Sequence, residues 1–190
     1  QGMLEDAERT LTELLRKDDD RADAHAAIGV VYDLARRADK ATPHHKRALA
    51  LKPDDPGLLN NLGFSLFLHG QPREALPHLQ RAAQLEPTNR RIRTNLGFAY
   101  AATSDWPRAS REFELGGTPA EARNNLGYAY ERQGQLQNAF DLYVEAVRLD
   151  PTFARARTNL EHVATKLGKP LPDDLPAAVT SKEPSHAAHK

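Results

Sequence analysis

The sequence has no cysteine, no excess of either charge and no long apolar segment. The lack of cysteine excludes disulfide bonds, thiolate metal sites and a cysteine nucleophile. The 26 basic side chains are matched by 26 acidic ones, so no net charge favours nucleic acid or an anionic membrane. No apolar run approaches the roughly 18 residues that a membrane helix requires. These absences argue against a nucleic-acid-binding protein and a membrane-embedded one.

What the sequence does contain is a repeated segment. "NNLGFSLFLHGQPREA" at 60–75, "TNLGFAYAATSDWPRA" at 94–109 and "NNLGYAYERQGQLQNA" at 124–139 align, and "AAIGVVYDLARRADKA" at 26–41 is a weaker copy. The shared glycines are Gly29, Gly63, Gly97 and Gly127. The first two intervals between them equal the period of about 34 residues that is typical of some arrays of stacked helix pairs, and the third is slightly shorter.

Each copy predicts two antiparallel helices that approach closely through small side chains. An alanine follows each glycine at a constant interval, at Ala41, Ala75, Ala109 and Ala139. We expect Gly63 to face Ala75 and Gly127 to face Ala139, which offsets the roughly 1 kcal/mol that glycine costs inside a helix. Gly70 and Gly134 suit the turn between the two helices. The second helices are expected to end before Pro53, Pro87 and Pro151.

This pattern resembles the tetratricopeptide repeat (TPR) family, whose repeat combines Leu-Gly, Tyr, Ala, an aromatic residue, Ala and Pro at fixed places. One copy carries it almost whole, with Leu126, Gly127, Tyr130, Ala139, Tyr143, Ala146 and Pro151. The resemblance implies an all-α fold. That fold is an α-solenoid of stacked antiparallel helix pairs, a TPR superhelix with a C-terminal capping helix and an irregular tail.

The repeat frame predicts a TPR array over residues 1–167 and a proline-rich tail over 168–190. The array comprises a half repeat formed by a lone helix at 3–17, repeats at 22–55, 56–89, 90–119 and 120–153, and a cap helix at 154–167. The partner of the lone helix is expected upstream. The repeat at 90–119 is shorter than its neighbours and closes with Gly116-Gly117. The tail shows no periodicity.

In the TPR fold, the residue after the motif glycine lines the concave groove, so the resemblance implies an aromatic groove. Phe64, Phe98 and Tyr128 occupy that place, and Phe67 lies one turn further along. Apolar anchors of this kind suit an amphipathic helix or an extended peptide. The alternative is that these rings pack between neighbouring repeats.

Pairs of polar residues precede the motif leucine. Asn61, Asn95, Asn125 and Asn159 recur in the TPR pattern and are expected to hold the helices together by side-chain hydrogen bonds. Asn60, Thr94 and Asn124 stand one residue earlier and are expected to face the groove. An amide there could pair with the backbone of a bound peptide.

Basic residues near this predicted groove favour an acidic partner segment, or else they are solvated helix surface. The cluster consists of Arg90, Arg91, Arg93, Arg123 and Arg132, of which Arg91 and Arg132 join the candidate groove residues. A carboxylate clamp like that of chaperone co-factors is not expected. That site needs a groove asparagine after the motif glycine, where this chain has Val30, Phe64, Phe98 and Tyr128.

The eight histidines do not form a metal-binding pattern. His44 and His45 would point about 100° apart on a helix. His186 and His189 have helical spacing but no third ligand, and His162 stands in the groove register. No Ser-His-Asp order, phosphate loop or paired-carboxylate pocket is evident. We therefore expect no catalytic activity, no metal and no cofactor.

These observations predict a non-catalytic scaffold that binds a peptide or helix of a partner protein. The segments "ASREFELGGTPAEA" and "AEARNNLGYAY" resemble the TPR lipoproteins of Flp (tight-adherence) pilus assembly, relatives in role of type IV pilus pilotins. That resemblance implies assembly of a bacterial pilus or secretion machine. It also implies a periplasmic, outer-membrane-associated location through a lipid anchor upstream of Gln1, without membrane insertion of this chain or nucleic-acid binding. The alternatives are a cytoplasmic TPR adaptor of another complex and a regulatory TPR segment of a larger enzyme.

Overall fold

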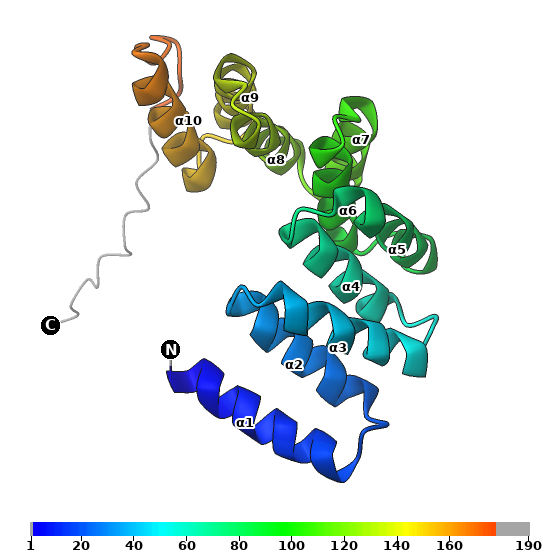
Figure 1. Ribbon diagram of the computed structural model, residues 1–190. Helices are drawn as coiled ribbons and strands as arrows, with labels where there is room; N and C mark the ends of the chain where they lie inside the picture. The colour runs from blue at the N-terminus through cyan, green and yellow to red at the C-terminus, as the bar shows by residue number, and fades with distance from the viewer. Residues whose placement is uncertain (1, 178–190) are drawn as a thin grey trace, which may run out of the picture. The chain divides into compact units, whose positions relative to one another are not determined.

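The computed structural model describes residues 2–177, whose regular structure is entirely helical (Figure 1). Its helices are α1 (Gly2–Lys17), α2 (Ala22–Leu34), α3 (Ala38–Leu51), α4 (Pro56–Leu68), α5 (Pro72–Leu85), α6 (Arg90–Ala102), α7 (Trp106–Gly116), α8 (Pro119–Arg132), α9 (Leu136–Leu149) and α10 (Ala154–Leu167). The helices α2, α4, α6 and α8 begin repeats and are called first helices, as is α10, and α3, α5, α7 and α9 are called second helices. The all-α fold predicted from the sequence is confirmed.

The chain forms two compact units, Gln1–Gly116 (unit 1) and Gly117–Lys190 (unit 2). Unit 1 contains α1–α7, and the described part of unit 2 contains α8–α10. Within each unit, a second helix packs on the first helix that follows it, as α3 does on α4 and α9 on α10. The boundary falls where α7 ends after 11 residues, whereas α5 runs for 14.

Close helix contacts occur where the sequence places small residues. A Cβ atom added to Gly63 would lie 3.2 Å from the carbonyl oxygen of Ala75. A Cβ added to Gly127 would lie 3.3 Å from that of Ala139. These two distances confirm the predicted glycine–alanine contacts.

The side chain that covers each motif glycine comes from the second helix of the same repeat, always at the same distance along the sequence. The pairs are Gly29 with His45, Gly63 with Leu79, Gly97 with Phe113 and Gly127 with Tyr143. All four covering side chains are at most 1% exposed. Three of them are ordinary core residues, but His45 brings a polar ring into the same place.

The turn inside each repeat has one residue with positive φ, at the same place in every copy. Gly70 and Gly134 have φ values of 76° and 75°, as the turn prediction requires. Arg36 and Ser104 hold the same position with φ values of 57° and 62°. Because a Cβ atom disfavours this region, both turns carry backbone strain.

The predicted tail is packed over its described part. After α10, residues 169–177 form no helix (Figure 1). Leu171 and Leu175 of this segment lie against the apolar cluster formed by α9 and α10. Residues 178–190, which include His186 and His189, lie outside the described residues.

Candidate functional site

Three of the predicted aromatic residues meet on unit 1. The ring centroids of Phe64 and Phe67 are 6.2 Å apart, and those of Phe67 and Phe98 are 6.3 Å apart. Phe98 also meets the buried ring of Phe113 edge-on at 4.8 Å. The three rings are half-buried, so they pack across α4 and α6 while one side of each stays accessible.

Aliphatic residues at equivalent repeat positions extend this surface. Val30 is 42% exposed and stands where Phe64 and Phe98 stand in their repeats, and Leu34 and Leu68 are 66% and 49% exposed. Because α2 contacts α4 and α4 contacts α6, equivalent positions fall on one side of unit 1. We call Val30, Leu34, Phe64, Phe67, Leu68 and Phe98 the apolar face. The sequence analysis missed Leu34 and Leu68, although they are separated by one full repeat period.

The expectation that Asn60 and Asn124 present their amides to a ligand is wrong. Both side chains are 2% exposed. The Oδ1 atom of Asn60 accepts a hydrogen bond of 2.8 Å from Nδ2 of Asn95. Asn124 accepts one of 2.9 Å from Asn159 in the same way. The paired amides satisfy each other between successive first helices, so the asparagines are structural.

The remaining candidates are divided between the two units. Thr94 is half-buried on α6, and Arg91 is exposed at the start of that helix. Tyr128, which is 43% exposed, and the exposed Arg132 belong to α8 of unit 2.

Two arginines of the predicted basic cluster support the helices of unit 1. Nη1 of Arg93 lies 2.8 Å from Oε2 of Glu112, and both side chains are mostly buried. Nε of Arg90 donates to the carbonyl oxygen of Gly116 at 3.1 Å. Both contacts link α6 to α7, so these two arginines help to hold the two helices together.

Asp33 is the centre of a polar cluster that sequence reasoning missed. Its Oδ1 accepts from Ser65 Oγ at 2.7 Å and from His69 Nε2 at 2.9 Å, and its Oδ2 accepts from His45 Nε2 at 2.8 Å. Asp33 is 10% exposed and His45 is 1% exposed. The signal in the sequence is a pair of polar residues at places where the next repeat has apolar ones, since Asp33 matches Phe67 and His45 matches Leu79.

The geometry of this Asp33 cluster is that of a structural site. Burial raises the pKa of Asp33, but hydrogen bonds from His45, Ser65 and His69 outweigh it and hold that pKa below the usual value. Ser65 donates its hydroxyl directly to the carboxylate and is fully buried. Within residues 2–177, the Nδ1 atom of His45 is buried and has no hydrogen-bond partner, while Nε2 donates to Asp33.

His44 and His45 are adjacent but face different partners. Nδ1 of His44 lies 2.9 Å from Nδ1 of His25, whose Nε2 is 3.0 Å from the carbonyl oxygen of Asp19. Burial, followed by the charges of His25 and His45, lowers the pKa of His44. Among residues 2–177, no group of three or more histidine, aspartate or glutamate side chains is placed to hold a metal ion.

Unit 2 has a second buried carboxylate, Glu131, at the same distance after its motif glycine as Asp33. Oε2 accepts from Tyr143 Oη at 2.9 Å, and Oε1 accepts from Lys166 Nζ at 3.0 Å. His162, which the sequence analysis placed in the groove register, lies near this carboxylate, with its Nε2 atom 3.6 Å from Oε1 of Glu131. Burial and the hydrogen bond to Glu131 raise the pKa of Tyr143. We call these residues the Glu131 cluster.

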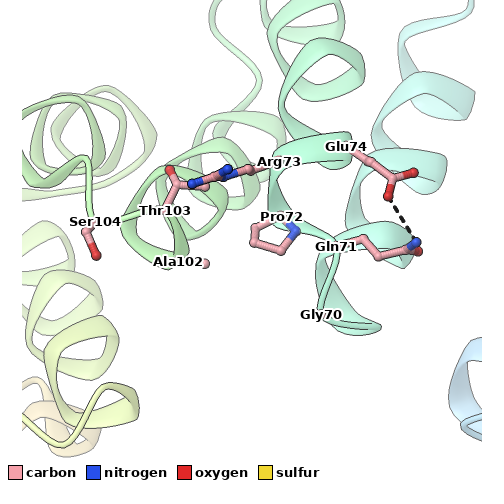
Figure 2. A pocket seen from close by; sticks show the side chains of 8 residues that line it. All are labelled: Gly70, Gln71, Pro72, Arg73, Glu74, Ala102, Thr103 and Ser104. Carbon is pink, nitrogen blue, oxygen red and sulfur yellow. Dashed lines mark hydrogen bonds between the residues drawn. The ribbon is translucent and has the colours of Figure 1, made fainter.

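A pocket of about 510 Å³ lies at the turns of two repeats in unit 1. Figure 2 shows Arg73 and Thr103 among the lining residues, with Gln71 joined to Glu74 by a hydrogen bond that measures 3.1 Å. Most of its lining side chains are exposed and polar, and none of the predicted site residues lies there. None of the described helices has the length and apolar character needed to cross a bilayer.

Comparisons with known proteins agree with this architecture. Tetratricopeptide repeat models match residues 1–56, 66–125 and 120–153. Among curated proteins, none matches the chain.

Several solved structures share the fold. YrrB, described as a TPR protein with an unusual peptide-binding site, is 25% identical, with a TM-score of 0.63 and 84% of each chain covered. PilF of Pseudomonas aeruginosa is 25% identical, with a TM-score of 0.64, over 88% of this chain and 78% of its own. PilW, described as a type IV pilus biogenesis factor, is 22% identical, with a TM-score of 0.69, over 87% and 79%. The stacked helix pairs, the regular repeat period and three matching family models together identify the chain as a tetratricopeptide-repeat protein.

Proposed function

We propose that the apolar face of unit 1 binds an apolar segment of a protein partner, and that the protein thereby acts as a scaffold in assembly. The observation that carries the proposal is the exposure of Leu34 and Leu68 at equivalent positions of the contacting helices α2 and α4, together with the half-buried ring of Phe67. Soluble proteins seldom leave large side chains exposed in a contiguous group without a partner. TPR proteins are generally scaffolds for protein–protein interaction, and the similar protein YrrB has a peptide-binding site.

The partner segment should carry apolar side chains spaced to meet successive first helices. An amphipathic helix supplies such anchors at i, i+3, i+4 and i+7, and an extended peptide supplies them at alternate residues. The face carries no lysine or arginine among its six residues, so affinity would come from apolar burial.

We further propose that the assembly is a bacterial pilus or secretion machine, with the protein held at the outer membrane through a lipidated upstream segment. The resemblance of residues 109–130 to pilus-assembly lipoproteins favours this role. The alternative, a cytoplasmic adaptor, would use the same face on a different partner. In a strain that encodes the protein, deletion of its gene should reduce surface pili, and a Leu34→Ser/Leu68→Ser copy should not restore them. Unchanged pilus numbers after deletion would contradict the pilus role but not peptide binding.

Peptide binding is tested directly with ligands selected from a displayed random-peptide library. The Leu34→Ser/Leu68→Ser variant should bind the selected peptides at least tenfold more weakly, because exposed apolar anchors are lost. The thermal midpoint should change little, since both leucines are exposed in the free protein.

Leu115→Ser is the matched control, because Leu115 is 51% exposed on the second helix α7 and lies off the apolar face. Equal losses in the control and the double variant, or no loss in either, would show that the apolar face is not the binding site.

A further inference from the structure

A second candidate binding surface lies on unit 2, under the chain's own segment 169–177, which we call the strap. In the repeats, a first helix is followed by a second helix that packs against it, but α10 is followed by the strap. Leu171 and Leu175 of the strap lie against the buried side chains of α9 and α10. The strap therefore covers an apolar surface where a helix would otherwise lie.

Polar contacts fix the direction of the strap. The carboxylate of Asp174 accepts two hydrogen bonds from Nη2 of Arg148, at 3.0 and 2.7 Å. Nη2 of Arg157 donates to the carbonyl oxygen of Pro176. At the other end, Nζ of Lys169 lies 5.8 Å from the ring centre of Phe140. The helices thus supply arginines to one end of the strap and an aromatic ring to the other.

Although the strap makes several contacts, each of them contributes little stability. Arg148 and Asp174 are 48% and 69% exposed, and exposed ion pairs contribute little stability. Leu171 and Leu175 are only half-buried. Within the described residues, the backbone hydrogen bonds of 169–177 run from Lys169 to Ala164 and from Leu175 to Pro172. The strap can therefore leave without breaking a helix or sheet ladder.

We propose that this face of α9 and α10 recognises an extended acidic segment of a partner protein, and that the strap occupies it until the partner displaces it. The partner segment has two leucines at the strap's spacing and an aspartate just before the second, as the strap has. The leucines fill the apolar positions, Arg148 binds the aspartate and Arg157 binds a carbonyl oxygen. Prolines favour the extended form in advance, which lowers the entropic cost of binding.

The test uses a labelled peptide with the strap sequence, KPLPDDLPA, and the full chain. A variant carrying Leu171→Ser and Leu175→Ser should leave the face open and bind the peptide. The wild-type chain should bind it at least tenfold more weakly, because its own strap competes at high effective concentration. A peptide with serine at the second leucine should bind the open variant at least tenfold more weakly. Fluorescence anisotropy measures each affinity, and circular dichroism confirms that the variants are folded.

Exchanging the two charges of the predicted ion pair tests whether Arg148 binds the aspartate of the peptide. Arg148→Glu in the open variant should weaken binding about fivefold, and a peptide with lysine in place of the aspartate should recover it. Arg81→Glu is the matched control, because Arg81 is a similarly exposed second-helix arginine in unit 1, and it should leave binding unchanged. If the leucine variant does not fold, Asp174→Lys in the full chain opens the face more mildly.

Three outcomes would overturn the proposal. They are no binding by a folded open variant, equal binding by the wild-type chain, and indifference to Arg148→Glu. Dimers of the wild-type chain that form with rising concentration and resist the peptide would assign the face to the strap of a second copy instead.

Discussion

The first and fourth repeats solve the same packing problem with different chemistry. In both, a ring covers the motif glycine and is tied to a buried carboxylate on the first helix, His45 to Asp33 and Tyr143 to Glu131. Asp33 receives its other hydrogen bonds from Ser65 and His69, which are largely buried. Glu131 receives one from Lys166, whose side chain is 44% exposed. The first repeat therefore depends more heavily on its carboxylate.

Removing each carboxylate should give the largest difference between the two repeats. Asp33→Ala leaves three donors without an acceptor and should cost about 3 kcal/mol of unfolding free energy. Glu131→Ala strands only the buried hydroxyl of Tyr143, because Lys166 can turn to water, and should cost about 1.5 kcal/mol. Urea unfolding measures both. Asp33→Asn keeps an acceptor oxygen and should cost less than Asp33→Ala. Equal costs for the two alanine variants would mean that the first repeat does not depend more heavily on its carboxylate.

Adding a methyl group at the covered glycines should cost about 2 kcal/mol in each repeat. A Cβ on Gly29 would lie 2.7 Å from the His45 ring, and one on Gly127 would lie 2.9 Å from the Tyr143 ring. Neither ring can swing away freely, because each is tied to its carboxylate. Gly2→Ala is the control, since no atom lies within 4 Å of its added Cβ, and its melting temperature should be unchanged or slightly raised. A neutral Gly29→Ala would show that His45 is free to move.

The two repeats should respond to pH in opposite directions. Because the pKa of His44 is lower in the folded protein, its ring takes up a proton more readily in the unfolded chain. Stability therefore falls as the pH drops below about 6.5. The raised pKa of Tyr143 keeps its phenol neutral in the fold, so stability falls as pH rises above about 10.

Amide exchange, corrected for intrinsic rates, should show unit 1 losing protection first at pH 5 and unit 2 losing it first above pH 10. His44→Gln should reduce the acid loss, and Tyr143→Phe should reduce the alkaline loss. The same order of opening at both pH values would contradict this assignment.

The smallest difference is expected at the turns. Arg36→Gly should stabilise the first repeat by about 0.5 kcal/mol, because the strain of its positive φ exceeds the flexibility that glycine adds to the unfolded chain. Gly134→Ala should destabilise the fourth by about 1 kcal/mol for the converse reason. The denaturant midpoint should therefore rise in Arg36→Gly and fall in Gly134→Ala. A lower midpoint for Arg36→Gly would mean that the arginine side chain stabilises the fold by more than the strain of its backbone costs.

The fold could be predicted because its signals are periodic. Gly63 with Ala75, and the prolines after the second helices, recur at fixed intervals and correspond to contacts and helix ends in the structure. The orientation of Asn60 could not be predicted, because it stands beside Asn61 and only packing decides which amide turns inward. The packing of Leu171 and Leu175 could not be predicted, because their segment lacks the periodicity that would show which side chains face a helix.

The candidate site was predictable in part. Phe64 and Phe98 were predicted from the position after the motif glycine and Phe67 from its place one turn further along, and the three rings do meet in the structure. Whether they bind a partner stays a prediction. Asp33 was missed because a single carboxylate in a helix resembles solvated surface until His45 and His69 are placed around it.

The bond between Asn95 and Asn60 has a consequence for how such an array can grow. It is directional, since the later repeat supplies the donor and the earlier one the acceptor. A tandem duplication of residues 56–89 would carry both Asn60 and Asn61. The copy of Asn61 could then donate to Asn60 of the repeat before it, so the new contact between repeats would keep its pair of amides. A duplication of 90–119 would offer Thr94 as the acceptor, whose hydroxyl is shorter than an amide. Gene duplication would thus propagate one repeat more readily than its neighbour.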